Sequence, residues 1–136
     1  MKRLYIVLFA VLALTGCKKA IEKIAEDMVI KAMTDSQWVI TSFTQNGNDI
    51  TTDFTGYKFK YYENRTVDAI KNDILERTGT WNGDAATMTT SANFTGAPNP
   101  ISLINGSWKI TNSTWTTVEA NQTNGTEVKT LKLKKI

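Results

Sequence analysis

The side chains of this sequence that could carry out chemistry are its carboxylates and one thiol. The 136 residues include no histidine and a single cysteine, Cys17. This excludes histidine-based acid–base catalysis, Ser-His and Cys-His nucleophiles, and metal sites built from histidine or several cysteines. Four acids are close enough in sequence to supply a glycosidase pair: Glu63, Asp68, Asp73 and Glu76. Acids on adjacent hairpins more often form a solvated face, so we expect no enzyme and no catalytic residue.

One loop carries oxygen ligands that calcium accepts. They are Asn46, Asn48, Asp49 and Asp53. An EF-hand-like loop requires glycine at its sixth position and an acid at its twelfth, where Thr51 and Tyr57 stand. Ordinary turn chemistry accounts for the loop, and no nucleotide-binding glycine motif occurs, so we expect no metal and no cofactor.

The excess of basic over acidic residues in the chain comes partly from its N-terminus. Sixteen Lys and Arg residues face thirteen Asp and Glu, and the isoelectric point is about 9.0. Two of the sixteen, Lys2 and Arg3, precede an apolar run over residues 4–14, as in a secretory signal. Its cleavage before Cys17 leaves fourteen basic residues without a long basic run, so we expect no nucleic-acid partner.

The segment Leu14-Thr15-Gly16-Cys17 resembles the bacterial lipobox, in which a peptidase cuts before a cysteine that carries diacylglycerol. The alternative is an ordinary signal peptide with an incidental cysteine. Acyl chains such as palmitate would hold Cys17 on a bilayer, since each buried methylene contributes about 0.8 kcal/mol. In the enteric lipoproteins that this segment resembles, an Asp at the position of Lys18 signals inner-membrane retention, so the resemblance implies the outer membrane of a Gram-negative envelope. Which leaflet Cys17 occupies is left open.

Residues 19–33 carry an apolar stripe at helical spacing: Ile21, Ile24, Ala25, Met28 and Ala32. This predicts a short amphipathic helix. Two positions for it are open, on the membrane beside the lipid or packed on the domain, and the modest size of its apolar residues favours the domain.

From residue 36 the sequence pattern changes from helical spacing to short alternating runs. These runs are rich in threonine and asparagine, which are strand and turn residues. Strands are predicted at 37–44, 57–62, 66–71, 74–81, 86–92, 101–110, 114–121 and 127–135. Residues 71–78 could equally form a helical turn. Short links such as Asn72-Asp73 make neighbouring strands antiparallel.

The predicted fold is all-β, an eight-stranded antiparallel up-and-down barrel behind the short N-terminal helix. The chain therefore divides into a cleaved signal peptide (1–16), a lipidated cysteine with its helical tether (17–35) and a barrel domain (36–136). We expect a monomer.

Aromatic residues alternate along the second predicted strand, which places one of its faces in the barrel interior. The candidate ligand-binding residues of that interior are Trp38, Tyr57, Phe59, Tyr61, Met88 and Trp115. An eight-stranded barrel is just wide enough to be filled by side chains or to hold one small ligand.

Several motifs together resemble the small lipocalin-like lipoproteins of Gram-negative bacteria. They are the lipobox, Ser36-Gln37-Trp38 at the first strand, the units Gly79-Thr80-Trp81 and Gly106-Ser107-Trp108, and the closing Leu131-Lys132-Leu133-Lys134. The similarity covers about residues 36–136. It implies a barrel that holds a small apolar ligand, and it supplies no catalytic residue.

Two functions are compatible with this sequence. The first is a lipid-anchored barrel that binds a small apolar or amphipathic molecule at the envelope. The second is a solid-core barrel that serves as a structural or protein-interaction module. An enclosed apolar void of about 300 Å³ or more would favour the first.

Overall fold

The computed structural model describes residues 23–136, so the predicted leader and Cys17 lie outside the described residues. A helix spans residues 23–34. Within the described range, no helix has the length and apolar character needed to cross a membrane.

Strands make up most of the chain after the helix. They are β1 (Gln37–Gln45), β2 (Asn48–Asp49), β3 (Tyr57–Tyr61), β4 (Thr66–Lys71), β5 (Ile74–Asp84), β6 (Thr89–Asn93), β7 (Gly106–Ser113), β8 (Thr117–Asn124) and β9 (Glu127–Lys135). Two short 3-10 helices interrupt them, η1 (Thr51–Phe54) and η2 (Ile101–Ile104).

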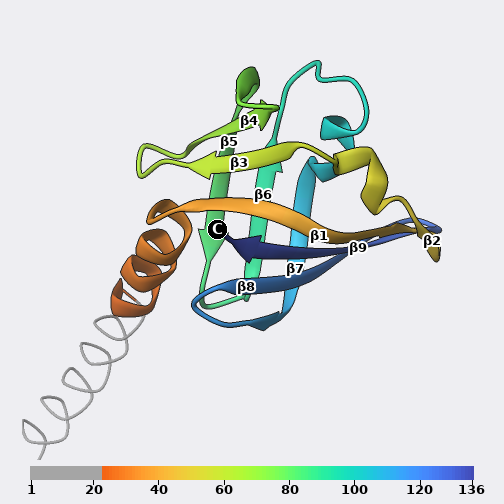
Figure 1. Cartoon of the computed structure of the whole chain (residues 1–136). Helices are drawn as coiled ribbons and strands as arrows, with labels where there is room; N and C mark the ends of the chain where they lie inside the picture. The colour runs from red at the N-terminus through yellow and green to blue at the C-terminus, as the bar shows by residue number, and fades with distance from the viewer. Residues whose placement is uncertain (1–22) are drawn as a thin grey trace, which may run out of the picture.

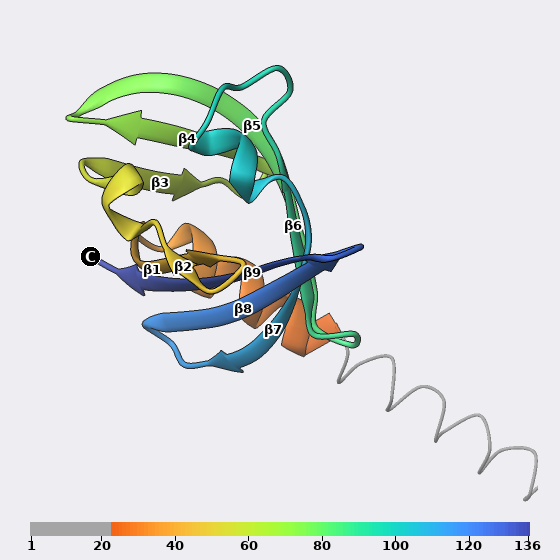
Figure 2. The ribbon, with the colours of Figure 1, turned by 90° about the vertical axis from the view of Figure 1, so that its right-hand side faces the viewer.

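The strands form one antiparallel sheet that closes on itself. Each strand from β3 to β9 pairs with the next along the chain, and β1 pairs with both β3 and β9. The β1–β9 seam runs from Trp38 opposite Lys135 to Gln45 opposite Lys129, with a bulge after Ile40. The result is the predicted eight-stranded up-and-down barrel, with the two-residue β2 added beside β1 (Figures 1 and 2).

Turn chemistry explains most of the boundaries. Asn72 and Asp73 have positive φ angles of 50° and 65°, as a tight hairpin turn requires, so residues 71–78 are strand and turn rather than helix. The predicted strand at 86–92 begins later, at Thr89. Met88 has a φ of 53°, and the Asp84 carboxylate accepts hydrogen bonds from the amides of the preceding turn.

One predicted strand needs a larger correction. Residues 101–104 of the predicted 101–110 strand form η2, and β7 begins only at Gly106. Ile101 and Ile104 are both buried, and their spacing of three places them on one side of a 3-10 turn. Gly106 has a φ of +106°, which favours glycine at this junction.

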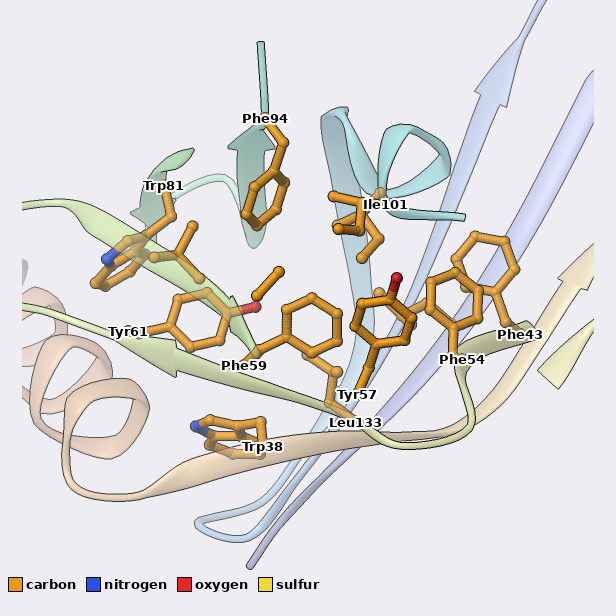
Figure 3. Close-up of a cluster of buried hydrophobic side chains, with 14 of the residues drawn as sticks. Trp38, Phe43, Phe54, Tyr57, Phe59, Tyr61, Trp81, Phe94, Ile101 and Leu133 are labelled. Carbon is orange, nitrogen blue, oxygen red and sulfur yellow. The ribbon is translucent and has the colours of Figure 1, made fainter. Parts of the chain in front are cut away.

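Aromatic side chains fill the part of the barrel that lies away from the helix (Figure 3). Phe43, Phe59 and Phe94 are at most 1% exposed. Phe43 stacks on Phe54 at 4.8 Å between ring centroids, and Tyr57 stacks on Phe59 at 6.2 Å (Figure 3). Each such side chain contributes about 1.5–3 kcal/mol on burial, so this row is a main source of stability.

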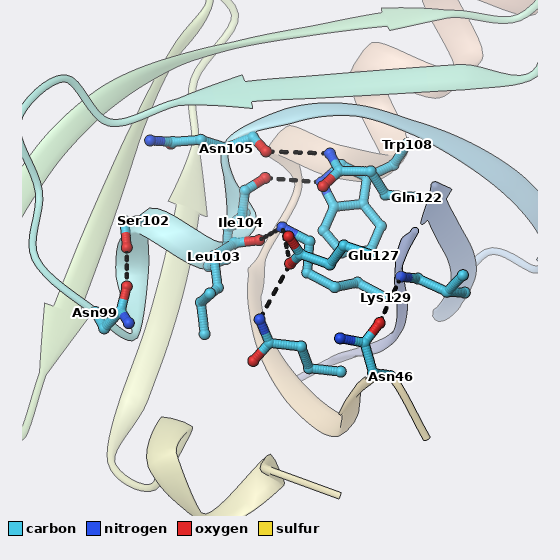
Figure 4. Close-up of polar contacts among 12 residues, drawn as sticks. Asn46, Asn99, Ser102, Leu103, Ile104, Asn105, Trp108, Gln122, Glu127 and Lys129 are labelled. Atoms are coloured by element: carbon cyan, nitrogen blue, oxygen red, sulfur yellow. Dashed lines mark hydrogen bonds and ion pairs between the residues drawn. The ribbon is translucent and has the colours of Figure 1, made fainter. Parts of the chain in front are cut away.

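A polar plug closes the barrel beyond this core. The Lys129 side chain points inward from β9, and its Nζ donates to the Leu103 carbonyl of η2 at 2.9 Å (Figure 4). The same Nζ lies 3.7 Å from a carboxylate oxygen of Glu127 and 5.6 Å from the Trp108 ring centroid. These contacts satisfy a buried ammonium group and hold η2 across this end of the barrel.

Candidate ligand-binding pocket

The other end of the barrel holds a cavity of about 240 Å³. It lies between the helix and the strand ends at the tips of the β5–β6 and β7–β8 hairpins. Its walls are mostly apolar, and all four tryptophans of the sequence line it: Trp38, Trp81, Trp108 and Trp115. This volume is below the roughly 300 Å³ that was expected to favour ligand binding and above the roughly 150 Å³ apolar cavity that binds benzene, so a guest must be smaller than a drug-sized ligand.

The helix covers one side of this cavity. Val29, Ala32 and Met33 line it, while Ile24 is 60% exposed. Met28 and Ala32 of the predicted stripe thus line the cavity, and Val29 and Met33 extend the covering face beyond it. The helix packs on the domain, the favoured of the two predicted positions.

Polar contacts fix the helix to the barrel. The Trp38 indole donates to the Met33 carbonyl at 3.0 Å, and Lys60 Nζ donates to the Thr34 carbonyl at 3.2 Å. Arg65 pairs with Glu26 at 3.3 Å. The first two bonds hold the last turn of the helix against the barrel, and this turn covers the cavity.

Three of the tryptophans share one bonding pattern. Like Trp38, the buried Trp81 and Trp108 donate their indole N–H to a backbone carbonyl, those of Tyr62 at 2.9 Å and Ile104 at 2.7 Å. Each bond satisfies the polar edge of a buried ring and leaves its apolar face to the cavity. Trp115 differs, because its side chain is 46% exposed and its ring centroid lies 4.9 Å from the Lys135 ammonium nitrogen.

Tyr61 brings a polar group to the cavity wall. Its ring meets Trp81 edge to face at 5.4 Å, and its hydroxyl points into the barrel interior (Figure 3). Burial alone raises the pKa of this hydroxyl, with no hydrogen-bond partner contributing among the described residues. The Tyr61 hydroxyl is therefore free to bond a polar atom of a guest.

The six predicted ligand-binding residues divide into three groups. Trp38 and Tyr61 are interior residues that line the cavity. Met88 and Trp115 also line it, but they are 42% and 46% exposed and form its rim, where the prediction placed them inside. They do so because both precede a strand: Met88 lies in the β5–β6 turn and Trp115 in the β7–β8 turn.

Tyr57 and Phe59 are interior residues away from the cavity. They belong to the aromatic row, with Tyr57 beside Phe54 at the far end of β3. Burial and a nearby Glu76 raise the pKa of Tyr57 to about 12. Their role in the structure is packing of the solid core.

The cavity residues that the site prediction missed include Val29, Met33, Trp81 and Trp108. The two tryptophans carried a signal, since the repeated Gly-x-Trp units singled them out, but we interpreted them as structural packing. Val29 and Met33 carried none, because they lie beside the predicted stripe, which includes their neighbours Met28 and Ala32.

The polar loop that suggested calcium is organised by its own turns. Asp49 accepts bonds from the amide and hydroxyl of Thr51 at 2.9 and 2.6 Å, which lower the pKa of its carboxyl. The Asn46 side chain accepts from the Val128 amide at 2.9 Å. Within residues 23–136, His, Cys, Asp and Glu form no group of three or more that could hold a metal ion.

The fold and the cavity define a small lipocalin-like barrel with a tryptophan-lined pocket beneath a helix. A search of the solved structures finds a similar barrel in the crystal structure of a DUF4847 family protein from Bacteroides vulgatus ATCC 8482. It has a TM-score of 0.52 and 13% sequence identity, and the match covers 76% of this chain and 95% of that one. No family model and no curated protein matches the sequence. At this identity the likeness concerns the fold alone.

Proposed function

We propose that the chain is an envelope lipoprotein, anchored through Cys17 and without enzymatic activity, whose barrel binds a small apolar or amphipathic molecule. The observation that carries the proposal is the cavity of about 240 Å³ on which all four tryptophans converge. The lipobox supports the anchor. The rest of the barrel interior is packed with side chains such as Phe43, Phe59 and Phe94. The guest therefore occupies the end of the barrel that the helix covers.

The walls indicate what kind of guest fits. Apolar surface dominates, and Tyr61 provides one hydroxyl that lacks a described partner. Such a site suits a compact apolar body with one polar group at its end, such as a short fatty acid or a substituted aromatic ring.

Titration with a chain-length series tests this proposal. The acylated chain in lipid nanodiscs is titrated with fatty acids from hexanoate to decanoate, with empty nanodiscs as the blank, and tryptophan emission is recorded. Affinity should rise by about fourfold per added methylene and then level off once the cavity is full. No emission change with any member of the series would contradict binding.

A matched pair of variants locates the site. Ala92 lines the cavity, whereas Ala97 packs on the core elsewhere. Ala92→Leu adds three carbons to the cavity and should weaken binding at least about tenfold, while Ala97→Leu adds the same atoms and should leave affinity unchanged. Equal effects of the two variants would place the guest elsewhere.

The packed lumen also favours a second candidate, a solid-core interaction module of the envelope. Crosslinking of the anchored chain in cells would then give one dominant protein partner. A blank in that experiment, together with a saturable ligand titration, would select the first function.

A further inference from the structure

Large apolar side chains ring the mouth of the cavity. Ile24, Met28, Met88 and Trp115 are 60%, 56%, 42% and 46% exposed, and we call these four residues the apolar rim. Three of them also line the cavity, and Ile24 lies one helical turn before Met28. They come from three separate parts of the chain, the helix and two hairpin turns, so the fold gathers them at one end.

The apolar rim lies close to the proposed anchor. Ile24 follows Cys17 by seven positions, and seven steps of chain span at most about 25 Å. An acylated Cys17 would therefore hold the rim within that distance of a bilayer, which raises its effective concentration at the lipid surface. The exposed Trp115 ring suits this position, since amphipathic aromatic side chains favour the headgroup layer.

We propose that the apolar rim docks on the bilayer that holds Cys17, so that the cavity opens toward the lipid and takes its guest from the membrane. This inference rests on the proposed anchor and pocket. It fixes the orientation of the barrel: the β5–β6 and β7–β8 turns face the bilayer, and the β4–β5 turn faces away.

The far turn supplies a matched control. Ile74 and Leu75 are also exposed, at 72% and 56%, but they lie at the other end of β5, ten residues from Asp84. Ten residues of strand correspond to about 33 Å. Both apolar sets are accessible in the free protein, and only the rim is placed to meet lipid.

Quenching of tryptophan emission by brominated phospholipid tests the docking. The acylated chain is reconstituted in vesicles of phosphatidylethanolamine and phosphatidylglycerol, with and without brominated acyl chains, and Trp115→Phe identifies the quenched component. The triple variant Ile24→Ser, Met28→Ser, Met88→Ser should lose the Trp115 quenching. Ile74→Ser with Leu75→Ser should keep it. All five substituted side chains are exposed, and circular dichroism confirms that each variant is folded.

A Cys17→Ser chain expressed without residues 1–16 separates this inference from the proposed anchor. At high lipid concentration it should still show Trp115 quenching that depends on the rim, with apparent affinity at least about tenfold weaker in the triple variant. Rim-dependent quenching in this chain supports docking even if the acylated chain is never found. Absence of Trp115 quenching in both chains, or equal quenching in the rim and far-turn variants, overturns it. A dimer joined through the rim in place of quenching also overturns it.

Discussion

Tyr61→Phe removes one buried oxygen and leaves the rest of the cavity wall in place. The ring keeps its edge-to-face contact with Trp81. Because the hydroxyl makes no described hydrogen bond, its loss breaks no bond within residues 23–136. We expect the free energy of unfolding at pH 7 to change by less than about 1 kcal/mol, since no hydrogen bond within the described residues is lost.

The pH dependence of the free energy of unfolding gives a second effect of known size. Burial raises the pKa of Tyr61, so the folded state keeps the hydroxyl protonated while the unfolded chain ionises near pH 10. The stability that this group contributes is fully present below pH 10 and is lost as the pH rises toward the folded pKa. By pH 11 the loss reaches about 1.4 kcal/mol relative to pH 8, and phenylalanine does not incur it.

Urea unfolding followed by tryptophan fluorescence at pH 8 and pH 11 measures both effects. The wild-type protein should lose about 1.4 kcal/mol more than Tyr61→Phe between the two pH values. Titration of lysines and of other tyrosines cancels in this difference. A variant less stable by more than about 1 kcal/mol at pH 7 would reveal a native partner for the hydroxyl, and equal losses at pH 11 would show that it is solvated. Either result refutes the reasoning.

Three other substitutions test separate parts of the structure. Lys129→Met should lower the free energy of unfolding by about 1–3 kcal/mol, because the Leu103 carbonyl loses its donor, and an unchanged urea midpoint would contradict the plug. Gly79→Ala places a Cβ 2.5 Å from the Asn93 carbonyl oxygen and should cost about 1–3 kcal/mol in thermal or urea unfolding; a neutral result would mean that β5 and β6 separate freely there. Cys17→Ser should abolish incorporation of labelled palmitate into the chain in cells, and continued labelling of the variant would reject Cys17 as the acylated residue.

The fold was largely predictable because alternation and turn residues act locally. Tyr57, Phe59 and Tyr61 identify a buried face of β3, and Asn72-Asp73 identifies a tight turn, without knowledge of any distant residue. The prediction failed at η2, where a strand was expected. Apolar residues spaced by three, such as Ile101 and Ile104, fit a 3-10 turn, and only the packing across the barrel end selects it.

The cavity was only partly predictable, because alternation gives the face of a strand and not the height along the barrel. Tyr57 and Tyr61 share a face of β3, yet only Tyr61 reaches the cavity. The helix adds a second ambiguity, since one residue corresponds to about 100° of rotation. The predicted stripe included Met28 and not Val29, yet both line the cavity, with Met28 more than half exposed.

Native mass spectrometry of the chain purified from its own host's membranes tests the central claim most directly. We predict a non-covalent mass of a small apolar molecule on the wild-type protein, absent from Ala92→Leu and retained by Ala97→Leu. A wild-type spectrum with no bound mass beyond covalent acylation, recorded under conditions that preserve weak complexes, would contradict ligand binding.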